Sequence, residues 1–243
     1  MRNILIAALL PVAACSMAAS SDDDGAPGIP AQGTGKTRTY AVADFTGVAL
    51  RGSDNVDVRV GPGFSVRADG DSELLDHLKI TKEGSTLRIE RMRSSGWSWG
   101  GDHARISVTM PRLTEAAIAG SGDMTIDRVA GGSFKGEGAG SGNLAVGVLQ
   151  VDKADISLAG SGNVKLGGTA KALSVSIAGS GDVEAGGLTA GQAEVSVAGS
   201  GSVRAAVDGP ANVSVMGSGD VDLGGKARCR TSKMGSGSVR CGG

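Results

Sequence analysis

The stretch Val175-Ser-Ile-Ala-Gly-Ser-Gly-Asp-Val-Glu184 decides the fold, because its pattern recurs throughout the second half of the chain. The Gly-Ser-Gly phrase at its centre begins at seven positions, and successive starts lie 20, 20, 19, 20, 18 and 18 residues apart. Self-similarity at such a period is typical of a solenoid, in which each repeat forms one coil and buries its apolar side against its neighbours. The seven starts are Gly120, Gly140, Gly160, Gly179, Gly199, Gly217 and Gly235.

Apolar residues alternate with small or polar ones inside each repeat, as Val175, Ile177 and Val183 illustrate. A period of two indicates β-strands rather than helices. We expect the glycines of the phrase where the coil bends sharply, because a residue without Cβ can adopt a positive φ or let two backbones approach. A second glycine cluster, at 167–168, 186–187 and 224–225, predicts a second turn in several coils.

These features predict an all-β fold, a right-handed parallel β-helix with about 18–20 residues per coil. Seven coils spaced about 4.8 Å apart would make a rod of roughly 30 Å. The alternative is a flexible linker, since the chain contains 42 glycines. Internal glycines cost about 0.5 to 1 kcal/mol each, whereas each buried Val, Ile or Leu contributes about 1.5 to 3 kcal/mol. The regular aliphatic positions therefore favour a packed rod.

The N-terminus reads as a secretion signal over residues 1–14, with one arginine, an apolar run and then small residues. Val12-Ala13-Ala14-Cys15 resembles the lipobox of bacterial lipoproteins, in which the cysteine is acylated and becomes the new N-terminus. Cleavage by an ordinary signal peptidase nearby is the alternative. A serine after Cys15 suggests sorting to the outer membrane of a Gram-negative bacterium. We therefore expect the protein to associate with the membrane through this lipid anchor.

Residues 15–39 are small, acidic and rich in turn formers, and they read as a flexible tether. The triplet Asp22-Asp23-Asp24 is a solvated linker segment rather than a calcium site, because three consecutive side chains do not converge on one ion. Residues 40–243 are expected to form one β-helix domain that is most regular over 116–243.

Residues 40–115 are less repetitive but still predict strands, interrupted by one short helix. Asp71 or Ser72 can cap that helix, and Leu74, Leu75 and Leu78 would form its apolar stripe. Glu83-Gly84-Ser85 reads as a hairpin turn. The expected strands are 42–50, 56–60, 64–68, 86–91 and 105–110.

A family resemblance follows from these phrases. Gly52-Ser53-Asp54-Asn55-Val56, a short Leu-Leu segment, strands ending at Met110-Pro111 and the serial Ala-Gly-Ser-Gly phrases resemble the bacterial head GIN domain family over about residues 40–239. The resemblance implies a right-handed β-helix and an adhesin-like role, without catalytic residues to carry over. The Gly52 phrase is a looser copy of the later ones, so the solenoid is expected to begin there.

The amino-acid composition limits the kinds of ligand that the protein is expected to bind. The chain has 24 basic and 25 acidic residues and no basic stripe with interleaved aromatics, which argues against nucleic-acid binding. If Cys15 is acylated, Cys229 and Cys241 remain as a pair and predict a disulfide around the last repeat. A two-cysteine metal site is the alternative, but neither flank supplies a histidine. No cofactor is expected.

Catalytic motifs are scarce. The two histidines, His77 and His103, accompany no nucleophile-elbow phrase, and no Gly-Ser-Gly phrase continues as a phosphate-binding loop. The enzymatic alternative is a glycan-processing lyase or hydrolase, a class that uses clustered carboxylates on parallel β-helices. Its candidate acids lie in the N-terminal portion, at Asp69, Asp71, Glu73 and Asp76, where their spacing suits a turn and helix start better.

Two features suggest a contact surface. The serine of every phrase, with Ala119, Ala159, Ala178 and Ala198, predicts a flat outer stripe of small side chains, which is either turn chemistry or a docking face. Trp97 and Trp99 lie between glycines and either stack on sugar rings or cover a solenoid end. We therefore expect a non-enzymatic envelope lipoprotein whose β-helix presents a binding or structural surface. A glycan or an envelope protein is the partner that such a binding surface would take, and the surface is also compatible with an oligomer.

Overall fold

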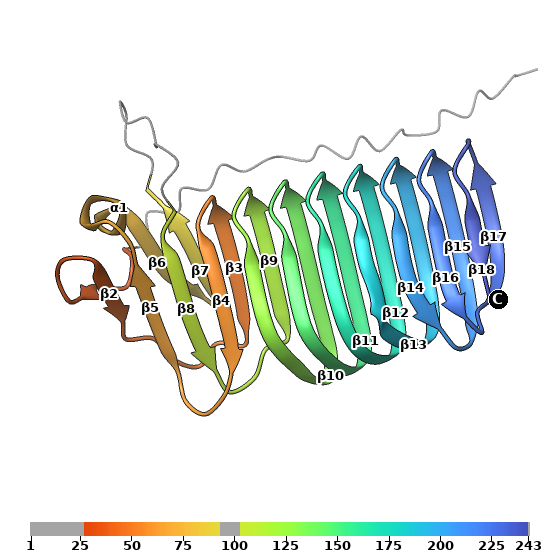
Figure 1. Ribbon diagram of the computed structural model, residues 1–243. Helices are drawn as coiled ribbons and strands as arrows, with labels where there is room; N and C mark the ends of the chain where they lie inside the picture. Colours follow the sequence, from red (N-terminus) through yellow and green to blue (C-terminus); the bar gives the residue numbers. More distant parts are fainter. Residues whose placement is uncertain (1–26, 93–102, 243) are drawn as a thin grey trace, which may run out of the picture.

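The computed structural model describes residues 27–92 and 103–242, and it is a β-solenoid of about 6 turns with a less regular N-terminal portion (Figure 1). About 69% is strand, and the described residues contain one minor helix. The predicted fold class is confirmed, although the seven phrases yield fewer full turns, because the last phrase is followed by only a three-residue strand. The N-terminal signal and residues 15–26 of the tether, including Cys15, lie outside the described residues.

The N-terminal portion is built from short elements. Residues 31–32 and 37–39, expected as tether, instead belong to two strands, and Arg38 on the second is only 9% exposed. The elements are β1 (Ala31–Gln32), β2 (Thr37–Tyr40), β3 (Gly47–Gly52), β4 (Asn55–Val60), β5 (Ser65–Asp69), α1 (Ser72–Asp76), β6 (Leu78–Glu83), β7 (Thr86–Arg91) and β8 (Arg105–Met110).

Two local predictions in this portion need correction. Residues 41–46 precede β3 and are not strand, and Asp44 among them has a positive φ of 58°. The helix α1 begins after Asp71 and buries Leu74 and Leu75, as expected, but Leu78 starts β6 instead of continuing the helix. The hairpin turn at Glu83-Gly84-Ser85 is confirmed, because β6 and β7 pair antiparallel around it.

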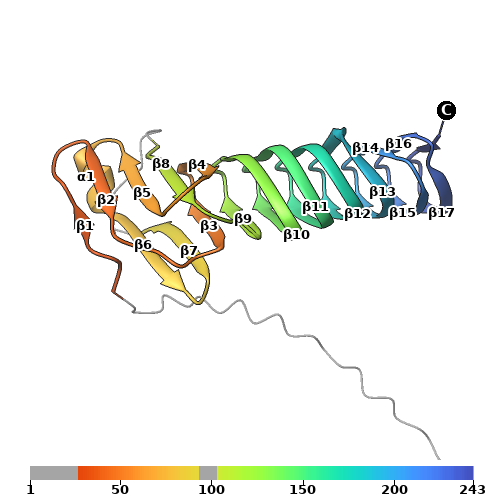
Figure 2. The ribbon, with the colours of Figure 1, turned by 90° about the horizontal axis from the view of Figure 1, so that it is seen from below.

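The first coils are interleaved in sequence. Strand β3 lies between β7 and β9 (Glu115–Gly120), and it is parallel to both. Gly52 is in register with Gly120, which confirms that the solenoid begins at the Gly52 phrase. The coil of β7 and β8 therefore stacks outside the coil of β3 and β4, although it follows that coil in the chain. Antiparallel β5 and β6 then cover its outer edge (Figure 2).

From β9 onward the strands stack in parallel register, coil on coil. The second glycine cluster, predicted to form a second turn, ends a strand at Gly225 but lies inside longer strands at 167–168 and 186–187. It produces irregular pairing inside long continuous strands, such as the shift between Lys165 and Gly167. These strands are β10 (Met124–Gly140), β11 (Leu144–Gly160), β12 (Val164–Gly179), β13 (Val183–Gly199), β14 (Val203–Val207), β15 (Pro210–Gly217), β16 (Val221–Gly225), β17 (Arg228–Met234) and β18 (Val239–Cys241).

The two glycines of each phrase meet different physical demands. The first has a positive φ, for example 137° at Gly179, a conformation that L side chains rarely adopt. The second lies against the preceding coil: a Cβ on Gly181 would be 2.0 Å from the carbonyl oxygen of Gly162. Each of the seven Gly-Ser-Gly phrases therefore requires two glycines, the first because of its backbone conformation and the second because a side chain would collide with the preceding coil.

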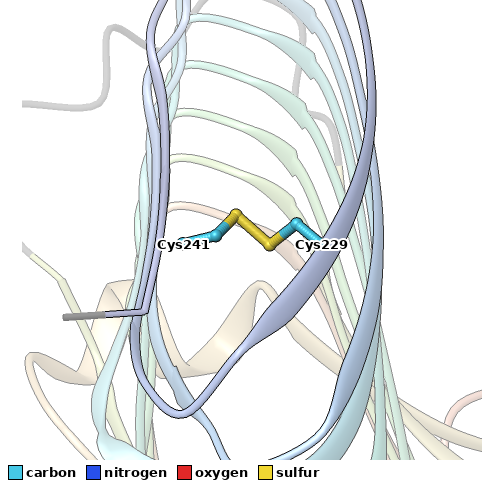
Figure 3. Close-up of a disulfide and its surroundings, with 2 residues drawn as sticks. All are labelled: Cys229 and Cys241. Carbon is cyan, nitrogen blue, oxygen red and sulfur yellow. A yellow bond between two sulfur atoms is a disulfide. The ribbon is translucent and has the colours of Figure 1, made fainter.

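Aliphatic side chains fill the interior in continuous rows. Val175, Val195 and Val213 are in register on successive coils, and each is no more than 3% exposed. At the far end of the solenoid the core closes with the predicted disulfide between Cys229 and Cys241, whose Cα atoms are 6.1 Å apart (Figure 3). In β17 the core-facing row continues with Thr231 in place of an aliphatic residue.

Candidate functional site: the outer face of the solenoid

The residue after each Gly-Ser-Gly phrase links one coil to the next. Asp123 Oδ1 accepts hydrogen bonds from the backbone N–H of Asn143, at 2.9 Å, and from its side-chain amide, at 2.8 Å. Asn143 Oδ1 receives the equivalent pair from Asn163. The bonds join residues 18 to 20 positions apart in the sequence, which lie on neighbouring coils. These acids and amides therefore hold coils together.

An exposed apolar row runs along the outer face beside the turns. The predicted alanine stripe is present, and it continues further than expected, because its last two members are Met216 and Met234, at 61% and 73% exposure. Exposed serines flank the row on both sides, among them Ser176 and Ser180. The row is in register through Ala119, Ala139, Ala159, Ala178, Ala198, Met216 and Met234.

A second row alternates in charge. This row contains one outward-facing side chain from each coil. Its first two members are uncharged, and the members that follow are alternately positive and negative. Opposite charges on adjacent strands stabilise a pairing by roughly 0.2 to 1 kcal/mol each. The row therefore favours this order of coils, and it consists of Lys165, Glu184, Arg204, Asp222 and Arg240.

A shallow groove of about 510 Å³ crosses five successive coils beside the second glycine cluster. Glycines form part of its floor, including Gly147, Gly167 and Gly186, and side chains of the alternating-charge row line one side. The groove carries both signs of charge, with Asp127 near one end and Arg204 near the other. Its length across the coils suits an extended ligand rather than a compact one.

Two of the acids that the enzymatic alternative would use, Asp69 and Asp76, make structural contacts. Thr37 donates a hydrogen bond to Asp69 Oδ1 at 2.8 Å, and hydrogen bonds from Arg67, with that from Thr37, lower the pKa of the Asp69 carboxyl. Asp76 pairs with Arg38 at 2.7 Å. A general acid in glycoside hydrolysis needs a raised pKa, so the shift at Asp69 is in the wrong direction for that role.

Several predicted site residues cannot be placed. Cys15, Trp97 and Trp99 lie outside the described residues, so the lipidation and aromatic-contact predictions stay predictions. His103 is an exposed residue just before β8.

Within residues 27–92 and 103–242 no group of three or more His, Cys, Asp or Glu side chains could hold a metal ion. No helix of that described part is long and apolar enough to span a membrane.

The structure also contains a buried ion pair that sequence reasoning missed. Asp54 is fully buried and accepts a hydrogen bond from Arg91 Nε at 2.8 Å, and the two side chains form an ion pair. The same carboxylate accepts the backbone N–H of Ala104 at 2.8 Å. Asp54 occupies the place of the second glycine in the first phrase, and this departure from the repeat was the available signal.

The fold and this face define a class of protein: a β-solenoid with a long, repetitive outer surface. A family model described as "Putative auto-transporter adhesin, head GIN domain" matches residues 44–227. The chain therefore belongs to the head GIN domain family, as the sequence phrases indicated. The search of curated proteins returned no match.

Solved structures agree with this assignment. A "putative adhesin" from Bacteroides fragilis has 24% identity and a TM-score of 0.78, and the alignment covers 84% of this chain and 95% of that one. A "putative lipid binding protein" from Parabacteroides distasonis has 26% identity and a TM-score of 0.68, with 86% and 97% coverage. A "putative adhesin" from Parabacteroides merdae, at 17% identity, 86% and 96% coverage and a TM-score of 0.61, shares the fold.

Proposed function

We propose that this protein is a non-enzymatic, lipid-anchored protein of the cell envelope, whose solenoid presents a binding surface. The observation that carries the proposal is the exposed row from Ala119 to Met234, flanked by serines and in register over seven rungs. Five of the seven members of this row are alanine, so an extended glycan or a partner's flat surface can approach the backbone along those five coils. The description of the family as adhesin-like supports an envelope location.

The anchoring part of the proposal rests on Val12-Ala13-Ala14-Cys15. Acyl chains on Cys15 would hold the protein in the outer membrane of a Gram-negative bacterium, since each buried CH₂ contributes about 0.8 kcal/mol. Cys15→Ala should move the protein from the membrane fraction to the periplasm. A wild-type protein that is already soluble, with its N-terminus downstream of Cys15, would refute the anchor.

The binding part is tested with a glycan array and a polysaccharide-degradation assay on the mature protein. Phospholipid vesicles belong in the same panel, because one structural relative is described as lipid binding. We expect binding without turnover, weakened by Trp97→Ala and Trp99→Ala. Turnover that is abolished by alanine at Asp69 or Asp76 would overturn the non-enzymatic assignment.

A further inference from the structure

The two ends of the solenoid differ in how their strand edges are covered. At the N-terminal end, β5 pairs antiparallel with β8 and β6 pairs antiparallel with β7, so the outermost coil has neighbours on both edges. At the other end, β17 pairs with β15 on one edge, and no described residue pairs with its second edge. Figure 1 shows β17 as the last strand of the rod. An edge of this kind presents unpaired backbone N–H and C=O groups.

The backbone of β17 is suited to receive another strand. Its seven residues are in unbroken register with β15, from Pro210–Arg228 to Met216–Met234, with no bulge in the pairing. The strand contains no proline, so every residue retains its backbone N–H. Lys233 Nζ donates to the carbonyl of Gly237 at 2.8 Å, and with the disulfide it closes the core beneath the edge. The disulfide and Lys233 therefore close the core here, and no described residue covers the outer backbone edge of β17.

The charge of this coil has a single sign. Residues 226–242 contain five basic side chains, all exposed, and no acidic one. Lys226 and the three basic residues of β17 take part in no ion pair found within the described part of the chain, whereas Arg240 on β18 is in register with Asp222 of the neighbouring coil. Exposed Met234 adds an apolar contact on the outer side of the same strand. The five are Lys226, Arg228, Arg230, Lys233 and Arg240.

We propose that the free edge of β17 binds an acidic, extended peptide segment of a partner protein by strand addition. Strand addition supplies the missing backbone hydrogen bonds, and acidic side chains on the added strand complement the basic coil. A second copy of this chain fits less well, because joining two such edges would oppose five positive charges with five more. Basic residues thus discourage self-association at this edge and select for an acidic partner. The inference rests on the proposed function and names where an envelope protein would bind.

The probe is an acetylated peptide of alternating glutamate and valine, eight residues long and fluorescently labelled, titrated into the purified full-length protein. A matched peptide with N-methyl groups on alternate residues has the same charge but cannot complete the strand pairing. We expect the first peptide to bind and the N-methylated one to bind at least tenfold more weakly. Equal binding of the two peptides, or of neither, would overturn strand addition.

The protein side of the test compares two charge reversals. Arg228→Glu with Arg230→Glu should weaken peptide binding at least tenfold, whereas Lys153→Glu with Lys171→Glu, at exposed mid-solenoid positions, should leave it within twofold. Equal weakening by both pairs would show non-specific charge attraction and refute the proposal. Dimerisation at low ionic strength that depends on residues 228–234 would refute it too, in favour of a second copy. Glycan binding and membrane anchoring are scored separately, so their failure is distinguishable from the failure of this inference.

Discussion

Gly181→Ala tests whether close contact between coils explains the second glycine of the phrase. The new Cβ would lie 2.0 Å from the carbonyl oxygen of Gly162, well inside the 3.4 Å at which ordinary contact begins. The obstacle is backbone, which cannot rotate away as a side chain does. The coils must separate locally, and the hydrogen bonds from Ser180 N and Gly181 N to Gly160 O, now 2.9 and 3.1 Å, would lengthen.

The magnitude follows from these contacts. Overpacking costs about 1 to 3 kcal/mol, and two weakened hydrogen bonds cost about 1 kcal/mol each. We therefore expect unfolding free energy to fall by about 3 to 5 kcal/mol. For a chain of this size, that corresponds to a drop in melting temperature of about 6 to 20 °C. Thermal and guanidinium denaturation followed by circular dichroism measure both quantities.

The matched control is Gly132→Ala, where a Cβ would meet nothing within 4 Å and φ is not positive. Replacing glycine at such a site reduces the entropy of the unfolded chain and stabilises by about 0.4 to 1 kcal/mol. Hydrogen exchange should place the loss in Gly181→Ala at the coils on either side of the phrase. If the two variants unfold within 0.5 kcal/mol of each other, contact between coils does not explain the glycine.

Three further predictions concern charge. Glu184→Lys places like charges on adjacent coils and should lower the unfolding free energy by about 1 to 2 kcal/mol in low salt, and by less in 1 M NaCl. The control Glu194→Lys, whose neighbours in register are uncharged, should change the unfolding free energy by under 0.5 kcal/mol. Equal losses in the two variants would show that the alternating row does not stabilise the fold. Asp54→Ala breaks a buried ion pair and should cost about 3 to 5 kcal/mol by chemical denaturation, so a loss under 1 kcal/mol would show that the pair is dispensable. The Ser238 hydroxyl lowers the pKa of Asp220, so this contact stabilises the fold above the ordinary aspartate pKa of about 3.9 and is lost as pH falls through the lower folded value. Ser238→Ala should raise that pKa in an NMR titration, and an unchanged pKa would contradict the assignment.

The regular solenoid could be predicted because its signals are local and repeated. A period near 20 residues, alternation around Val175 and Ile177 and two glycines in each phrase all follow from one coil meeting the next. The disulfide pairing could be predicted because the cysteines flank the last repeat. Even the start of the solenoid was visible, since the Gly52 phrase copies the later ones.

Other features depended on pairings between distant parts of the chain. The coil of β7 and β8 stacks outside that of β3 and β4, and Asp54 pairs with Arg91 across 37 residues. The alternation of apolar and polar residues predicts a strand but does not specify which other strand it will pair with. The sequence pattern therefore cannot predict the interleaving of these coils. The single-signed edge at β17 likewise has meaning only once the fold shows that nothing described covers it. Repetition thus encodes how one coil fits the next, whereas the ends, where repetition stops, are decided by contacts that only the folded chain brings together.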